Sequence, residues 1–137
     1  FASRDNLTVS KRPVLTITYD RAAGATPGTV TDLSAAATSS SSVTLSFTEA
    51  DNGAGQPARY DVRYASPTIS WGSANSVTQG TCAIPLAGTQ IGATKTCTVT
   101  GLSALTAYQF QVVPYRGTLN LDAVFGSLSN VDGATTP

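Results

Sequence analysis

The chain has no histidine, and Glu49 is its only glutamate. Without an imidazole, a nucleophilic serine lacks its usual general base, and the commonest nitrogen ligand of zinc is missing. The aspartates are scattered along the chain, so the paired carboxylates that glycoside hydrolysis needs have no candidates. No glycine-rich phosphate-binding loop is present either. The sequence therefore predicts a protein that is not an enzyme and that has no cofactor and no metal site.

Charge of either sign is also scarce. Lys and Arg number eight, Asp and Glu number eight, and charged residues make up 12% of the chain, about half the usual share. This balance gives no basic surface, so we expect no nucleic-acid partner. No apolar run approaches the ~18 residues that span a bilayer, so we expect no membrane insertion. The abundant Ser and Thr are typical of bacterial secreted proteins, which predicts a secreted or cell-surface location.

Methionine is absent and the chain begins at Phe1, so we expect that an upstream segment was removed. Cys82 and Cys97 are the only cysteines. In an oxidising compartment they would form a disulfide that closes a loop of about 15 residues and contributes roughly 3 kcal/mol in the chain-entropy model. The alternative is two buried thiols, because Cys97 shares strand parity with Val99 and could fill the core.

The most informative stretch of the sequence is 98–115, TVTGLSALTAYQFQVVPY. It is typical of a strand end, a tight corner and a long second strand. In that second strand apolar residues alternate with glutamines, which predicts one buried face and one wet face. The apolar positions are Tyr108, Phe110 and Val112, and the polar ones are Gln109 and Gln111. We expect Leu102 and Leu105 to fill the corner, and the Tyr108 phenol to reach back to the upstream backbone.

This pattern is the tyrosine corner of immunoglobulin-like sandwiches. The stretch resembles the E strand, EF corner and F strand of bacterial extracellular fibronectin type III modules, and the resemblance covers residues 30–136. It implies an all-β, immunoglobulin-like sandwich with an extra β-strand at the N-terminus. In the expected strand C, 58–65, the alternating pattern predicts that Tyr60, Val62 and Tyr64 face inward and that Arg59, Asp61 and Arg63 face outward. In the G strand the resemblance places Leu128 and Val131 inward.

The first 20 residues do not belong to such a module. The run from Val14 to Tyr19 is strongly β-prone, and Arg12-Pro13 before it favours an extended entry. This segment resembles the last strand of the DNRLRE family of bacterial extracellular β domains, through Phe1, Ser3, Arg4, Arg12, Pro13, Leu15, Thr18 and Tyr19. The resemblance implies that most of a preceding domain is missing. We therefore predict an orphan or donor strand over 1–20, a linker over 21–29 and the fibronectin type III domain over 30–137.

An apolar strand without its parent sheet exposes unpaired backbone groups. We expect one of three outcomes: the strand is disordered, it pairs with an edge of its own sandwich, or it pairs with a sheet of another copy. The residues that would pair are Val14, Leu15, Ile17 and Tyr19. The third option predicts a non-catalytic extracellular structural module that self-assembles into a fibre or surface array. The alternative is a spacer or carbohydrate-binding accessory module released from a larger secreted polysaccharide-active or surface protein.

Four apolar residues form a candidate contact patch: Trp71, Leu119, Leu121 and Phe125. A single Trp on a secreted β domain can stack on a sugar ring, which makes a glycan a candidate partner, or it can cap the sheet edge. The loop that carries the other three is either an exposed contact or folds back over the core. The tripeptide at 116–118, Arg-Gly-Thr, occupies the place of an integrin motif but lacks its Asp, so that activity is not implied.

Overall fold

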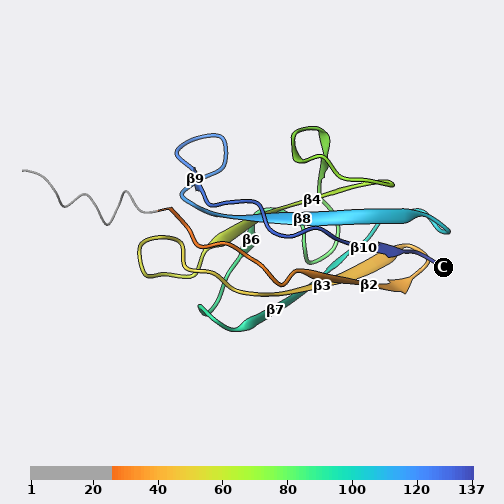
Figure 1. The fold of residues 1–137 in the computed structure, drawn as a ribbon, viewed down its shortest axis with the longest axis horizontal. Helices are drawn as coiled ribbons and strands as arrows, with labels where there is room; N and C mark the ends of the chain where they lie inside the picture. The colour runs from red at the N-terminus through yellow and green to blue at the C-terminus, as the bar shows by residue number, and fades with distance from the viewer. Residues whose placement is uncertain (1–25) are drawn as a thin grey trace, which may run out of the picture.

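The computed structural model describes residues 26–137, which form two antiparallel sheets packed against each other (Figure 1). One sheet has the order β2-β3-β7, and the other has the order β10-β8-β4-β5, with β6 paired to β4 and β9 paired to β8. The predicted all-β sandwich is confirmed. The strands are β2 (Ser34–Ser39), β3 (Ser42–Thr48), β4 (Arg59–Ala65), β5 (Asn75–Ser76), β6 (Leu86–Ala87), β7 (Thr94–Val99), β8 (Ala107–Arg116), β9 (Val124–Phe125) and β10 (Asp132–Thr135), with a short 3-10 helix, η2 (Trp71–Ser73), between β4 and β5.

The core lies between the two sheets and follows the period-two pattern of the strands. In β3 the side chains of Val43, Leu45 and Phe47 are at most 2% exposed, whereas the residues between them are partly exposed. From the other sheet, Tyr60 meets Phe47 edge to face, with ring centroids 4.8 Å apart. Alternation therefore assigns the inner faces correctly because each strand shows one side to the facing sheet.

The tyrosine corner forms as predicted. The Tyr108 phenol oxygen accepts a hydrogen bond from the Ser103 backbone N–H at 2.8 Å, and Leu102 is buried beneath the corner. The prediction for Leu105 is wrong, because this side chain is 84% exposed. Leu105 adopts a φ of 53°, in the left-handed region, and this turn directs the side chain into solvent.

The outer face of the sheet that contains β8 and β4 was predicted to be exposed to solvent, but it is only partly exposed. Gln111 is buried and its side-chain amide donates to the Ser129 carbonyl at 2.8 Å. Asp61, which was predicted to face outward, is also buried, and the strand register pairs it with Val113. Its Oδ2 pairs with the Arg63 guanidinium at 3.2 Å. Period two marks which side a residue occupies, but it does not reveal that loops cover this outer side.

Near the final strand, the residues that face the core differ from those predicted. Leu128 and Val131 are 46% and 43% exposed, so their predicted inward placement is wrong. The buried positions are instead Ser129 and Thr136, and Ala134 packs against the core. Ser129 is fixed because its hydroxyl accepts the Val112 N–H at 2.9 Å.

The predicted N-terminal strand over 1–20, including Val14, Leu15, Ile17 and Tyr19, lies outside the described residues, as do positions 21–25 of the predicted linker. From Thr26 the chain runs without regular structure toward β2. Within this stretch the Gly28 N–H donates to the Asp51 carbonyl at 2.8 Å. The domain boundaries themselves stay predictions.

Candidate functional site

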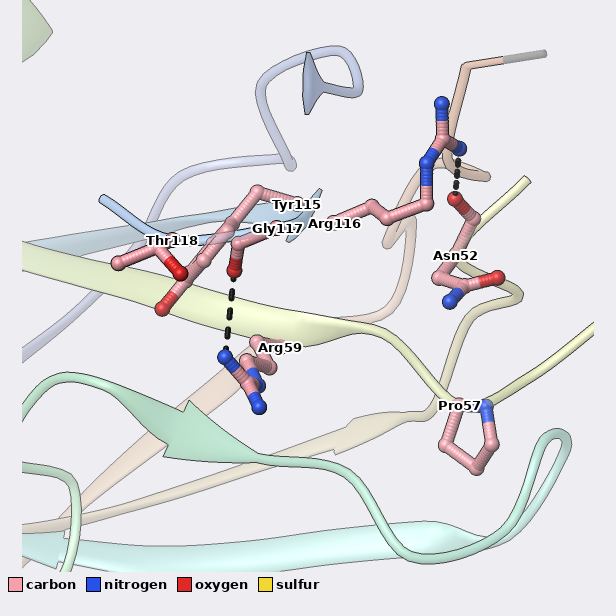
Figure 2. Close-up of a pocket in the computed structure, with 7 residues that line it drawn as sticks. All are labelled: Asn52, Pro57, Arg59, Tyr115, Arg116, Gly117 and Thr118. Carbon is pink, nitrogen blue, oxygen red and sulfur yellow. Dashed lines mark hydrogen bonds between the residues drawn. The ribbon is translucent and has the colours of Figure 1, made fainter. Parts of the chain in front are cut away.

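A hollow of about 360 Å³ lies at the end of the sandwich where β4 begins and β8 ends (Figure 2). It is framed by the loop before β4 and the turn after β8. The residues that line it are mostly polar, and two of them are arginines: Asn52, Pro57, Arg59, Tyr115, Arg116, Gly117 and Thr118.

Arg59 and Tyr115 form the floor of this pocket. They are directly opposite each other in the β4–β8 ladder, so their side chains emerge on the same face of the sheet. The Arg59 guanidinium donates one hydrogen bond, from Nη1 to the Gly117 carbonyl at 3.2 Å. Within the described residues Arg59 forms no ion pair, and Asp61, two residues further along β4, pairs with Arg63. The pocket floor therefore carries positive charge.

Tyr115 is 1% exposed, and its ring lies 5.8 Å from that of Phe125 in β9. Burial raises the pKa of the Tyr115 phenol; the Arg59 charge opposes this rise, and the Asp61 charge adds to it. The phenol is thus a neutral hydrogen-bond donor and acceptor across the physiological range. Its hydroxyl ends beside Thr118 and above Arg59 in Figure 2, and it has no hydrogen-bond partner in the part of the chain that the structure describes.

The loop before β4 is held by side-chain to backbone hydrogen bonds. Asp51 Oδ1 accepts the Gly53 N–H at 2.6 Å, and Asn52 Oδ1 accepts the Ala54 N–H at 2.7 Å. These bonds form a tight turn, because Asp and Asn side chains readily mimic a backbone turn. Arg116 Nη1 donates to the Asn52 carbonyl at 2.6 Å, which ties this loop to the end of β8.

The turn after β8 is equally constrained. The Thr118 N–H donates to Asp122 Oδ1 at 2.8 Å, and the Asp122 N–H returns to the Thr118 carbonyl at 3.1 Å. Gly117 adopts a φ of 89°, and a Cβ at this position would meet the Asp122 carbonyl oxygen at 2.8 Å. A glycine is required here, and the pocket wall is preformed.

The structure does not bring the four residues of the predicted contact patch together. Phe125, 47% exposed, flanks the pocket floor, and Leu121 is 82% exposed on the same connection, where Leu119 is half-buried. Trp71 instead lies over Arg63, whose guanidinium carbon is 4.3 Å from the ring centroid. Arg63 also donates to the Trp71 carbonyl at 2.8 Å, so one face of the indole is already occupied. The two alternatives for Trp71, capping the sheet edge and stacking on a sugar ring, both stay predictions.

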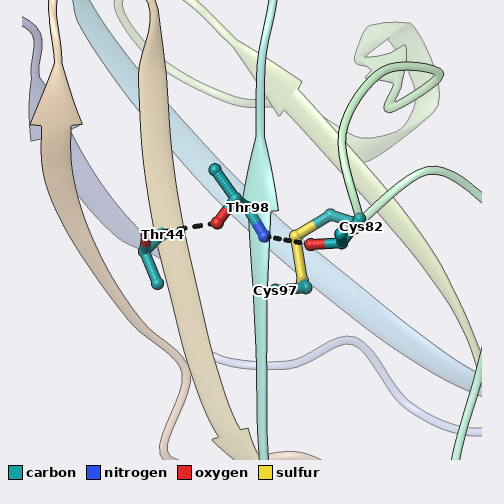
Figure 3. Close-up of a disulfide and its surroundings, with 5 residues drawn as sticks. Thr44, Cys82, Cys97 and Thr98 are labelled. Atoms are coloured by element: carbon teal, nitrogen blue, oxygen red, sulfur yellow. Dashed lines mark hydrogen bonds between the residues drawn. A yellow bond between two sulfur atoms is a disulfide. The ribbon is translucent and has the colours of Figure 1, made fainter.

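The predicted disulfide is formed. Cys82 and Cys97 are bonded, with Cα atoms 5.0 Å apart, and they join the irregular segment after β5 to β7 (Figure 3). The Cys82 N–H donates to the Thr98 carbonyl at 3.1 Å, and the Thr98 N–H donates to Thr81 Oγ1 at 2.7 Å. This segment therefore covers the C-terminal half of the β7 edge.

Residues 26–137 contain no group of three or more Cys, Asp or Glu side chains placed to hold a metal ion. No helix in this described range is long and apolar enough to cross a membrane.

Sequence reasoning missed the pocket. It singled out residues 116–118 only as a failed integrin motif and read Arg59 as part of a solvated strand face. The pairing of Arg59 with Tyr115 depends on strand register, which the period-two pattern does not specify. The sequence feature that could have indicated the pocket is a Tyr followed by Arg-Gly at the end of a predicted strand.

The fibronectin type III domain model matches residues 28–120. No match is found among curated proteins. Among solved structures the chain resembles the crystal structure of domains A168–A170 from titin, with a TM-score of 0.54 and 20% sequence identity. This likeness covers 81% of the chain and 32% of the titin structure, so the chain spans about a third of that neighbour. At this identity the likeness concerns the fold alone.

Proposed function

Since the chain belongs to the fibronectin type III family, whose domains are typically structural and non-catalytic, we propose that it is an extracellular structural module that assembles with copies of itself. In this proposal the segment from Val14 to Tyr19 of one copy adds as a strand to a sheet edge of the next copy. The disulfide between Cys82 and Cys97 supports the extracellular location, because such bonds persist in oxidising compartments.

The observation that carries the proposal is a free strand edge at β10. Thr136 N–H donates to the Thr106 carbonyl at 3.0 Å, and the antiparallel register then directs the Asp132 and Ala134 backbone groups toward β8. The N–H and C=O groups of Gly133 and Thr135 point the other way. In the described part of the chain no strand pairs on that side.

The two edges of the other sheet, β2 and β7, are better protected. On β2 the Leu33 and Ala35 N–H groups donate to the side chains of Asn130 and Asp132, at 2.9 and 2.7 Å. On β7 the segment that carries Cys82 covers the C-terminal half. Edge strands are the usual sites of strand addition, so β10 is the acceptor edge that this arrangement favours.

The test compares the full chain with Ile17→Asp and, as a matched control, Thr16→Asp. In an extended strand Ile17 shares a face with Leu15 and Tyr19, whereas Thr16 is on the opposite face. We expect light scattering to show oligomers and electron microscopy to show filaments for the unsubstituted chain and Thr16→Asp, and monomers for Ile17→Asp. A chain that stays monomeric at high concentration contradicts the proposal.

Hydrogen exchange identifies the acceptor edge without a substitution there. We expect the Gly133 and Thr135 amides to gain protection in the assembled chain but not in Ile17→Asp. The Thr96 amide, which points away from β3 on the uncovered half of β7, should change in neither. Protection gained at Thr96 instead would move the acceptor site to β7.

The second candidate is a spacer or accessory module within a larger secreted polysaccharide-active or surface protein. It is favoured because the start of the described chain and the C-terminus lie at opposite ends of the sandwich, which suits modules joined end to end (Figure 1). A monomeric full chain would support this second candidate.

A further inference from the structure

The pocket between Arg59 and Thr118 has the chemistry of a ligand site, independently of the assembly proposed above. Tyr115 is the first reason. Its side chain is 1% exposed, yet its hydroxyl lines the pocket and has no hydrogen-bond partner among the described residues. Among the described residues the buried side-chain polar atoms without a partner are Asp61 Oδ1 and Arg63 Nε, so the Tyr115 hydroxyl is not enclosed. It is open to the pocket and is available there as a hydrogen-bond donor and acceptor.

The charge of the pocket is the second reason. Arg59 uses one guanidinium N–H on the Gly117 carbonyl at 3.2 Å and has no ion pair in the described part of the chain. A guanidinium offers five N–H donors in a planar fork that matches a carboxylate. The remaining donors of Arg59 are thus available beside the Tyr115 hydroxyl.

The rest of the lining supplies neutral donors on a fixed frame. The side-chain oxygen of Asn52 accepts the N–H groups of Ala54 and Gln56 at 2.7 and 3.2 Å, which leaves its amide nitrogen to donate. The Thr118 hydroxyl makes no hydrogen bond within residues 26–137, whereas its backbone is held by Asp122. Such groups match ring hydroxyls, and pre-organised donors need little ordering on binding.

The geometry points to a binding site for a hexuronic acid residue of an acidic polysaccharide. Its carboxylate pairs with Arg59, and its ring hydroxyls bond to Tyr115, Thr118 and Asn52 (Figure 2). The volume of the hollow, about 360 Å³, is larger than that of a lone carboxylate or sulfate ion and is large enough for a sugar ring. The combination of one strong cation with several hydroxyl partners favours a hydroxylated carboxylate over a simple anion.

The test is calorimetric titration of the full chain with trigalacturonate. Tyr115→Phe keeps the ring against Phe125 and removes the hydroxyl, and we expect it to weaken binding about fivefold to tenfold. Arg59→Gln should weaken binding roughly tenfold or more, because a charge-assisted bond is lost. The matched controls are Tyr64→Phe, outside the pocket, and Lys95→Gln, which removes one positive charge from the other sheet. Both controls should bind as the unsubstituted chain does.

Two further ligands separate the sources of affinity. The carboxyl-reduced, neutral trisaccharide should not bind, and dextran sulfate should bind without sensitivity to Tyr115→Phe. The inference is overturned if trigalacturonate does not bind at millimolar concentration, if the neutral trisaccharide binds equally, or if both pocket variants bind normally. Thermal unfolding shows whether each variant is folded. The Ile17→Asp variant should retain binding, so failure here is distinguishable from failure of the assembly.

Discussion

At the scale of single residues, the buried polar side chains hold the loops. Glu49, the only glutamate, is 3% exposed, and its carboxylate accepts the Thr89 and Gln90 N–H groups at 2.6 and 3.1 Å. A Cβ at Gly88 would meet the same carboxylate at 2.6 Å, so a glycine is required beside it. The oxygens of Glu49 are thus engaged in holding the loop after β6, and the side chain has a structural role.

Tyr60 provides a pH-dependent probe of the core. It is fully buried and its phenol oxygen accepts the Ala50 N–H at 2.7 Å. Burial raises the pKa of Tyr60 to about 12, against the lowering effect of the Ala50 N–H and with a further rise from Glu49. In the unfolded chain the phenol ionises near pH 10. The folded state therefore holds the proton more tightly, and its stability falls as the pH rises above about 10.

We expect the free energy of unfolding to fall by roughly 3 kcal/mol between pH 10 and pH 12 through this residue. Urea titrations across this range measure the loss. The control is Tyr60→Phe, which is less stable at pH 7 by about 1 to 2 kcal/mol because the Ala50 N–H loses its acceptor. Its stability should decline less steeply above pH 10, and an equally steep decline in both proteins would contradict the assignment.

At the scale of elements, β2 is attached to the last segment of the chain by side chains. Asn130 Oδ1 accepts the Leu33 N–H and its Nδ2 donates to the Leu33 carbonyl, both at 2.9 Å. Asp132 accepts the Ala35 N–H at 2.7 Å. One amide side chain therefore satisfies both backbone groups of Leu33, as a neighbouring strand would, and this attaches the start of β2 to the segment before β10.

Removing this connection should loosen β2 specifically. We expect Asn130→Ala to lower the free energy of unfolding by about 1 to 2 kcal/mol and to speed hydrogen exchange at the Leu33 amide. Asn75→Ala is the matched control, because Asn75 is exposed on β5 and its side chain forms no hydrogen bond within residues 26–137. Chemical unfolding and exchange measure the two effects. Unchanged exchange at Leu33 would show that β2 is held by other contacts.

At the scale of the whole molecule, the disulfide fixes a segment that regular structure does not. The stretch between β5 and β7 contains only the two-residue strand β6, and Cys82 within it is fully buried against the core. The bond to Cys97 closes a loop with a sequence separation of 15. A cross-link of this span restricts the unfolded chain, which favours the folded state.

We expect the double variant Cys82→Ala/Cys97→Ala to be less stable than the unsubstituted chain by roughly 3 kcal/mol. Thermal and urea unfolding measure the difference, and reduction of the unsubstituted chain should reproduce it. The variant should retain the sandwich, since the tyrosine corner and the β3–β7 ladder do not depend on the bond. Equal stability of the oxidised and reduced chains would contradict this prediction.

The sequence by itself determined the sandwich, its inner faces, the tyrosine corner and the disulfide. These features follow from local spacing: period-two alternation in β3, the position of Tyr108 after its corner, and a single pair of cysteines. Spacing along one strand is a property that the sequence contains directly.

Only the tertiary structure decided which outer positions are covered. Leu105, Leu128 and Val131 were predicted inside and are exposed, whereas Asp61 and Gln111 were predicted outside and are buried. The pocket likewise arises from register, which sets Arg59 beside Tyr115, and from loops whose paths depend on distant partners. The alternation along a strand indicates which face of the sheet a residue lies on, but whether that residue is buried depends on which other segments of the chain cover that face.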